Sequence, residues 1–176
     1  RNSQGPQVLC LVKTSKPFQA FCFISSCMNF IKAAGLGDIA KLREWVYVHP
    51  MMDVNVVDHS GNSALHRAVD SGKPNVMQYL LSLKADIAIR NEREETPLAC
   101  AVGKIRSSYV TPAVVELVEL LVEAKSDTNV NNGYSTLLHD LLVGCSEENE
   151  STAVDIARLL LSHGGRPSLT MSSVGG

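Results

Sequence analysis

The sequence predicts an all-helical solenoid built from stacked helix–turn–helix units. Three observations predict this fold class: apolar residues recur at helical spacing, the helical segments come in pairs, and the pairs repeat with a period of roughly 33 residues. The clearest unit runs from Asp58 to Arg90. One unit of this size cannot bury its own apolar faces, so neighbouring units must stack on it.

The unit at residues 58–90 shows how its elements are specified. Gly61 allows a tight turn without a Cβ penalty, and the Ser63 hydroxyl can cap the helix that follows. That helix, predicted over residues 63–71, ends at Gly72-Lys73-Pro74, and a second helix is predicted over residues 75–83. The segment Ser63-Ala64-Leu65-His66-Arg67-Ala68 is similar to the T-P-L-H-x-A signal of ankyrin repeats.

Further copies of the pattern follow in order. Residues 96–98 read Thr-Pro-Leu, with Thr96 as the N-cap and Pro97 as the first helical residue, and residues 136–139 read Thr-Leu-Leu-His. Helix pairs are therefore predicted at residues 96–102 and 111–124, and at 136–143 and 152–162. The chain resembles an ankyrin repeat protein with about four repeats, near residues 28–57, 58–90, 91–129 and 130–167.

The two ends of the chain are interpreted differently. The opening repeat carries Lys41, Arg43 and Glu44, and this polar outer face is typical of a terminal capping repeat. Residues 1–27 are expected to form a poorly ordered extension. The alternatives are an element packed on the first repeat, a signal-like segment, or sequence upstream of Met28. Residues 168–176 are expected to be a disordered tail, and a longer array truncated there is an open alternative.

Two departures from the repeat pattern are expected to have consequences. Lys84, Glu94 and Lys125 stand where the family prefers glycine, so they should be forced into the left-handed region at a cost of about 1 kcal/mol each. The last two repeats also carry insertions between their helices, around residues 104–110 and 145–150, and each second helix should start early, at Thr111 and at Ser151 or Thr152. The insertions should form a joint lobe that binds a second partner, or two independent mobile loops.

Composition excludes several function classes. The net charge is −2 and no basic stripe is present, which argues against nucleic-acid binding. No apolar run approaches the roughly 18 residues of a membrane span. The five cysteines are scattered and lack zinc spacing, so they read as free thiols in a reducing compartment, the cytoplasm or the nucleus.

No catalytic constellation stands out, so an enzyme is not expected. His66 and His139 occupy the His position of the repeat signal, where the resemblance implies a structural imidazole that bonds the backbone of a neighbouring repeat. The acidic run at residues 147–150 lacks the alternating ligands of a calcium loop. No metal site and no cofactor are predicted.

The resemblance implies a protein-binding function: a monomeric adaptor or stoichiometric inhibitor, or alternatively a regulatory or targeting ankyrin domain cut from a larger enzyme or channel. It places the partner on the hairpin tips, on the exposed side of the first helices and on the insertions. It also places Asn129 at a hairpin position that asparagine hydroxylases modify in similar repeats. The binding residues predicted on this basis are His59, Ser60, Asn62, Asp70, Ser71, Glu92, Arg93, Glu95, Lys104, Tyr109, Asn132, Tyr134 and Val143.

Overall fold

The computed structural model confirms the all-helical solenoid. It describes residues 27–50, 53–105, 111–129, 136–143 and 149–165. Within these ranges the backbone forms no strand, and Val57 and Ser63 form an isolated bridge. A helix covers residues 27–36. It is followed by α2 (Ile39–Val48), α3 (Ala64–Asp70), α4 (Pro74–Ser82), α5 (Pro97–Ile105), α6 (Pro112–Glu123), α7 (Leu137–Val143) and α8 (Glu150–Ser162).

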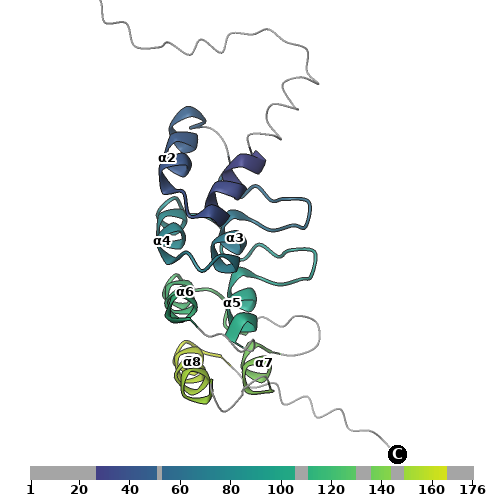
Figure 1. Cartoon of the computed structure of the whole chain (residues 1–176). Coiled ribbons are helices and arrows are strands. Elements are labelled where there is room, and N and C mark those ends of the chain that lie inside the picture. The colour runs from purple at the N-terminus through teal and green to yellow at the C-terminus, as the bar shows by residue number, and fades with distance from the viewer. Residues whose placement is uncertain (1–26, 51–52, 106–110, 130–135, 144–148, 166–176) are drawn as a thin grey trace, which may run out of the picture.

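The helices form two parallel columns (Figure 1). One column, the inner helices, contains α3, α5 and α7 beneath the helix of residues 27–36, and the other, the outer helices, contains α2, α4, α6 and α8. The connections from α2 to α3 and from α4 to α5 project as hairpin loops beyond the inner helices. We call the surface made by these loops and the exposed sides of the inner helices the inner face.

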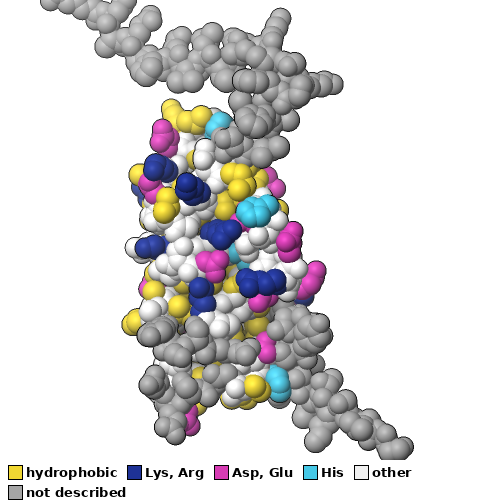
Figure 2. Space-filling view, turned by 45° about the vertical axis from the view of Figure 1, so that its right-hand side comes forward, with side chains coloured by type: hydrophobic (Ala, Val, Ile, Leu, Met, Phe, Trp, Pro, Cys, Tyr) yellow, Lys and Arg dark blue, Asp and Glu magenta, His cyan; other side chains and the backbone are white. Residues whose placement is uncertain are grey.

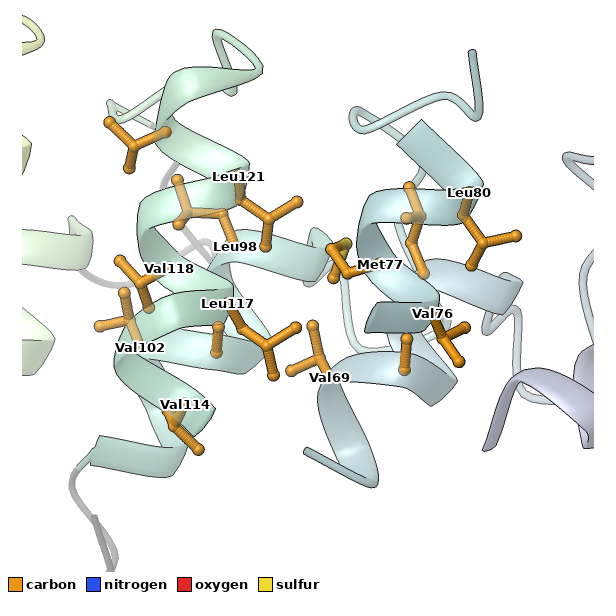
Figure 3. Close-up of a cluster of buried hydrophobic side chains, with 14 of the residues drawn as sticks. Val69, Val76, Met77, Leu80, Leu98, Val102, Val114, Leu117, Val118 and Leu121 are labelled. Carbon is orange, nitrogen blue, oxygen red and sulfur yellow. The ribbon is translucent and has the colours of Figure 1, made fainter. Parts of the chain in front are cut away.

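The core is a continuous apolar layer between successive helix pairs. Leu98, Leu117 and Leu121 of the α5–α6 pair are fully buried. Figure 3 shows this cluster next to Val69 and Met77 of the α3–α4 pair. Burying a side chain of this size stabilises the fold by about 1.5–3 kcal/mol. Because each helix pair packs against the next, the positions of the loops on the inner face depend on stacking along the whole array.

The first repeat ends the stack with polar side chains, as predicted. Trp45 is 8% exposed and the centroid of its ring lies 4.3 Å from that of Phe30, so it anchors the core of this repeat. Lys41, Arg43 and Glu44 are exposed on the same helix. Asp38 caps α2, because its Oδ1 accepts a hydrogen bond of 3.0 Å from the backbone N–H of Lys41.

The predicted left-handed residues are confirmed. Lys84, Glu94 and Lys125 have φ angles of 59°, 60° and 65°. Lys84 and Lys125 follow the ends of α4 and α6, where a left-handed residue lets the N–H of the next residue reach the last turn of the helix. Each of these side chains therefore costs about 1 kcal/mol that glycine would avoid.

One boundary of each insertion was predicted wrongly, whereas α6 begins at Pro112 with Thr111 as its N-cap residue and α7 ends at Val143, as predicted. The helix expected to end at Val102 continues as α5 to Ile105, which is 2% exposed, so Lys104 and Ile105 are helical. The last helix begins at Glu150 with Asn149 as its N-cap residue, ahead of Ser151 and Thr152. The buried Nδ2 of Asn149 donates to the carbonyl of Ile105 at 3.3 Å. The stems of the two insertions are therefore joined, while residues 106–110 and 144–148 lie outside the described residues.

Candidate functional site

The first hairpin of the inner face is organised by the buried carboxylate of Asp58. Its Oδ1 accepts backbone hydrogen bonds from Ser60 at 2.9 Å and from Asn62 at 3.0 Å. Its Oδ2 accepts from Nε of Arg67 at 2.9 Å and also from Nη2 of that guanidinium. Because the Asp58 side chain is only 2% exposed, one carboxylate fixes the hairpin loop to helix α3.

Asp58 stays ionised despite its burial. Burial by itself would raise the pKa of its carboxyl, but the hydrogen bonds from Arg67, Ser60 and Asn62 outweigh it, and the pKa lies below its ordinary value. Stability gained from this group is fully present above the unfolded-state pKa of about 3.9 and is lost as the pH falls through the lower folded-state pKa. The hairpin is therefore held by a charged contact at neutral pH.

A chain of ion pairs runs from this hairpin across the inner face. Nη1 of Arg67 lies 3.8 Å from Oδ2 of Asp70, and Nζ of Lys104 lies 3.6 Å from Oδ1 of Asp70. Nζ of Lys104 also donates to the backbone carbonyl of Asp70 at 3.0 Å. The chain links α3 to α5 with opposite charges, and Figure 2 shows acidic and basic side chains intermixed in the same way over the visible surface.

A hollow of about 410 Å³ lies beside this ion-pair chain, between the helix of residues 27–36 and α3. Met28 and Leu36 contribute exposed apolar side chains, 39% and 64% exposed respectively. The charged side of the hollow is formed by Asp58, Arg67 and Asp70. Apolar surface beside charged groups suits a partner side chain that is anchored by packing and oriented by its polar neighbours.

The second hairpin repeats the first with an amide in place of the carboxylate. Oδ1 of Asn91 accepts hydrogen bonds from the backbone N–H groups of Arg93 at 2.9 Å and Glu95 at 3.1 Å. Its Nδ2 donates to Oδ1 of Asn62 at 3.2 Å, which ties the two hairpins together.

Burial raises the pKa of the Cys100 thiol beneath this hairpin to about 12, with Glu95 adding to the effect. Cys100 is thus protonated and packs beneath the hairpin.

Most of the predicted binding residues that the structure describes reach the inner face. His59, Asp70, Ser71, Glu92, Arg93 and Val143 are exposed, and Ser60, Glu95 and Lys104 are half-buried. Asn62 was predicted wrongly, because its side chain is only 8% exposed and bonds Asn91. Tyr109, Asn132 and Tyr134 lie outside the described residues. Sequence reasoning missed the Asp58–Arg67 pair, although both residues stood in the best-defined repeat.

His66 has the structural role that was predicted for it. It is 1% exposed, its Nδ1 lies 3.2 Å from the backbone N of Ser63, and its Nε2 lies 3.0 Å from the carbonyl of Glu95. These contacts fit a neutral imidazole that accepts at Nδ1 and donates from Nε2 across the repeat boundary. His139 is exposed, so the buried role predicted for both histidines is confirmed only for His66.

The stability of the fold should fall as the pH is lowered from about 7.5 to about 5.5. Burial lowers the pKa of His66, although its bond to Glu95 opposes the shift, whereas a histidine in the unfolded chain titrates near about 6.5. The unfolded state therefore binds the proton first. One such proton contributes at most about 1.4 kcal/mol per pH unit to the slope. Urea unfolding across this pH range measures it.

The matched variants separate His66 from the other histidines. His66→Gln should flatten the pH dependence of stability, at the cost of a lower stability at neutral pH. His139→Gln should leave the slope unchanged, because that ring is exposed. A His66→Gln variant with the same slope as the wild-type chain would show that the buried imidazole is not the group responsible.

Asn129 lies exposed just beyond the left-handed Lys125. Its backbone N–H donates to Oδ1 of Asp127 at 2.8 Å, and its Nδ2 donates to the carbonyl of Gly164 at 3.0 Å. The side chain therefore links the last two repeats. Hydroxylation at Asn129 stays a prediction.

Among the described residues, no cluster of three or more His, Cys, Asp or Glu side chains has the arrangement of a metal site. In the same part of the chain, no helix combines the length and the apolar character needed to cross a bilayer. The features that the inner face does offer are ordered loops, paired charges and one apolar hollow.

Comparison with known families agrees with this geometry. The family model described as ankyrin repeats in three copies matches residues 30–132. The chain belongs to the ankyrin repeat family. The match ends before the last helix pair, yet α7 and α8 stack on α5 and α6 in the same way as the earlier ankyrin repeats stack on each other (Figure 1).

A solved structure with the same fold involves a protein complex. It is a predatory endopeptidase from Bdellovibrio bacteriovorus in complex with an immunity protein, and a chain of it matches the ankyrin array with a TM-score of 0.59 at 25% identity. The match covers 77% of this chain and 63% of that chain, so this chain spans less than two thirds of the length of that relative. An ankyrin fold is a protein-interaction scaffold and is typically non-enzymatic, so the chain is expected to bind another protein.

Proposed function

We propose that this ankyrin protein is a non-enzymatic scaffold that binds one protein partner through its inner face, as an adaptor or a stoichiometric inhibitor. The apolar hollow beside the Arg67–Asp70–Lys104 ion pairs carries the proposal. The hollow offers Met28 and Leu36 as contact surface, and the ordered hairpins keep the recognition elements in place before binding. Preorganised loops lower the entropic cost of association.

The similarity to a structure that contains an immunity protein supports an inhibitor-like mode, in which occupancy of a partner's surface is itself the activity. We also propose a cytoplasmic or nuclear location, which the free thiols of Cys27 and Cys100 support. We further propose that the protein acts as a monomer. The ion pairs set orientation and specificity, because exposed pairs of this kind contribute only about 0–1 kcal/mol each. The apolar contacts supply most of the affinity.

Leu36→Glu should weaken partner binding at least about tenfold, the equivalent of about 1.4 kcal/mol, by placing a carboxylate in the apolar hollow. Affinity capture with mass spectrometry identifies the partner, and titration of the purified partner measures the loss. Glu116→Arg changes an exposed residue of the outer helix α6 and serves as the control. Equal loss in both variants, or no loss in either, would reject the inner face as the binding surface.

A further inference from the structure

The boundary between the second and third repeats differs from the boundaries on either side of it. A turn in which an aspartate Oδ1 accepts from the backbone N–H two residues later recurs in three repeats, at Asp53–Asn55, Asp86–Ala88 and Asp127–Asn129. The turn aligns the second residue of each pair. Ala88 therefore has a methyl group where the first and third repeats have a carboxamide.

The two carboxamides reach into the repeat that follows them. Oδ1 of Asn55 accepts from the backbone N–H of Asp86 at 2.7 Å. Nδ2 of Asn129 donates to the carbonyl of Gly164 at 3.0 Å. A methyl group can form neither bond, so the contact that these asparagines make across their boundaries is missing at Ala88.

A hollow of about 270 Å³ lies at this place, between the connection from α4 to α5 and the residues that follow α6 (Figure 1). Its walls include Ile87, Ala88 and Arg90 on one side and Lys125, Ser126 and Asp127 on the other. One molecule of liquid water takes up about 30 Å³. The hollow is therefore larger than a single bridging water requires.

The wall opposite Ala88 also differs from its counterparts. Ala85, Ser126 and Gly165 are aligned, because the backbone N–H of each donates to the carbonyl five residues earlier. Ser126 is the polar one of the three. It is only 9% exposed, and its hydroxyl has no hydrogen-bond partner in the part of the chain that the structure describes. A buried hydroxyl without a partner is destabilising, so a bound group that pairs with it recovers free energy.

The charges around the hollow favour a neutral polar ligand over an ion. Nη1 of Arg90 lies 3.7 Å from Oε2 of Glu94, so this cation has a counter-ion. Lys125 and Asp127 contribute one charge of each sign. A bound carboxylate would be repelled by Asp127, and a bound cation by Lys125. A primary carboxamide has an acceptor oxygen and donor N–H groups without a net charge.

We propose that this hollow binds the side-chain carboxamide of an asparagine or glutamine of the protein partner. The carboxamide oxygen accepts from the backbone N–H of Asp127, and the amide nitrogen donates to the hydroxyl of Ser126, which changes its rotamer to meet it. The methylene groups pack on Ile87 and Ala88. This inference rests on the proposed function for the existence of a protein partner, but it uses a different hollow from the one beside residues 27–36.

A heteronuclear NMR titration of the full chain with N-acetyl-glutamine methylamide tests the site without the partner. The probe should shift the backbone amide resonances of Ser126 and Asp127, and the shift should saturate. Two analogues of similar shape serve as controls, one with glutamate and one with homoleucine in place of glutamine. Both should bind at least about tenfold more weakly, because one hydrogen-bonded pair is lost or a like charge is added.

Matched variants assign the effect to the hollow. Ala88→Asn supplies the missing carboxamide within the chain, so it should abolish probe binding and raise the thermal unfolding midpoint by about 2–4 °C. Asn55→Ala removes the corresponding bond at the first boundary and should lower the midpoint by a comparable amount. Ser126→Ala reproduces the residue found at position 85, so it should weaken probe binding about tenfold without lowering the midpoint.

The captured partner then tests the source of the carboxamide. Ala88→Asn should weaken partner binding at least about fivefold. Unchanged partner affinity in Ala88→Asn, with binding still weakened by Leu36→Glu, would reject the carboxamide site and leave the inner face in place. The proposal is also overturned if the homoleucine analogue binds as tightly as the glutamine probe, or if no probe shifts the amide of Asp127, because water alone would then fill the hollow.

Discussion

Asp58→Ala should lower the free energy of unfolding by about 3–5 kcal/mol, the usual cost of breaking a buried ion pair by removing one partner. The substitution leaves the guanidinium of Arg67 without its carboxylate. It also leaves the backbone N–H groups of Ser60 and Asn62 without their acceptor. Chemical denaturation followed by circular dichroism measures the loss. Since Asp58 also fixes the first hairpin, partner binding should weaken with it.

Two variants separate the contributions of Asp58. Asp58→Asn keeps a side-chain oxygen in the arrangement that Asn91 shows in the next repeat, so it should lose clearly less stability than Asp58→Ala. Asp70→Ala removes a side chain that is 42% exposed and at the far edge of the same network, and it should cost no more than about 1 kcal/mol. Equal losses for Asp58→Ala and Asp70→Ala would contradict the burial argument.

Gly61→Ala should cost roughly 2–4 kcal/mol, because backbone strain and a steric clash act together. Gly61 has a φ of 72°, and a Cβ added there would lie 2.9 Å from the backbone N of Glu92 and 3.0 Å from Cα of Asn91. The N–H of Glu92 donates to the carbonyl of Ser60, so the clash pushes apart the two hairpins where they bond. Thermal and urea unfolding measure the cost.

Gly72 provides the control for this prediction. Its φ is 61°, but a Cβ added there would meet only the Cβ of Ala113, at 3.9 Å. Gly72→Ala should therefore show the strain alone, about 1 kcal/mol. If the two alanine variants lost the same stability, close approach of the hairpins at Gly61 would play no part.

Local sequence patterns were sufficient to predict most of the fold. Apolar spacing, the Pro and Gly boundaries and the Thr and Ser caps placed the helix pairs to within a few residues. The error at the end of α5 arose because the family period was followed instead of the apolar spacing, which continues from Leu98, Ala101 and Val102 to Ile105. The cap at Asn149 depends on a contact with Ile105 across the repeat boundary, which local spacing does not contain.

The candidate site was predicted less completely, because its key contacts are tertiary. Exposure at hairpin tips followed from the repeat pattern, and His59, Glu92 and Arg93 are exposed as expected. Asn62 is buried because it forms a hydrogen bond with Asn91 of the next hairpin. The sequence of a single repeat does not indicate that partner. The pairing of Asp58 with Arg67 likewise depends on how the loop folds back onto α3.

Site-specific photo-crosslinking to the captured partner tests the central claim, binding through the inner face, most directly. A photoreactive amino acid is placed at Leu36, His59 or Glu92 on the inner face, and at Gln78 or Glu116 on the outer helices, all of which are exposed. The proposed function predicts crosslinks from the inner-face positions and none from the outer helices. Crosslinks from Gln78 and Glu116 alone would place the partner on the opposite side of the array and contradict it.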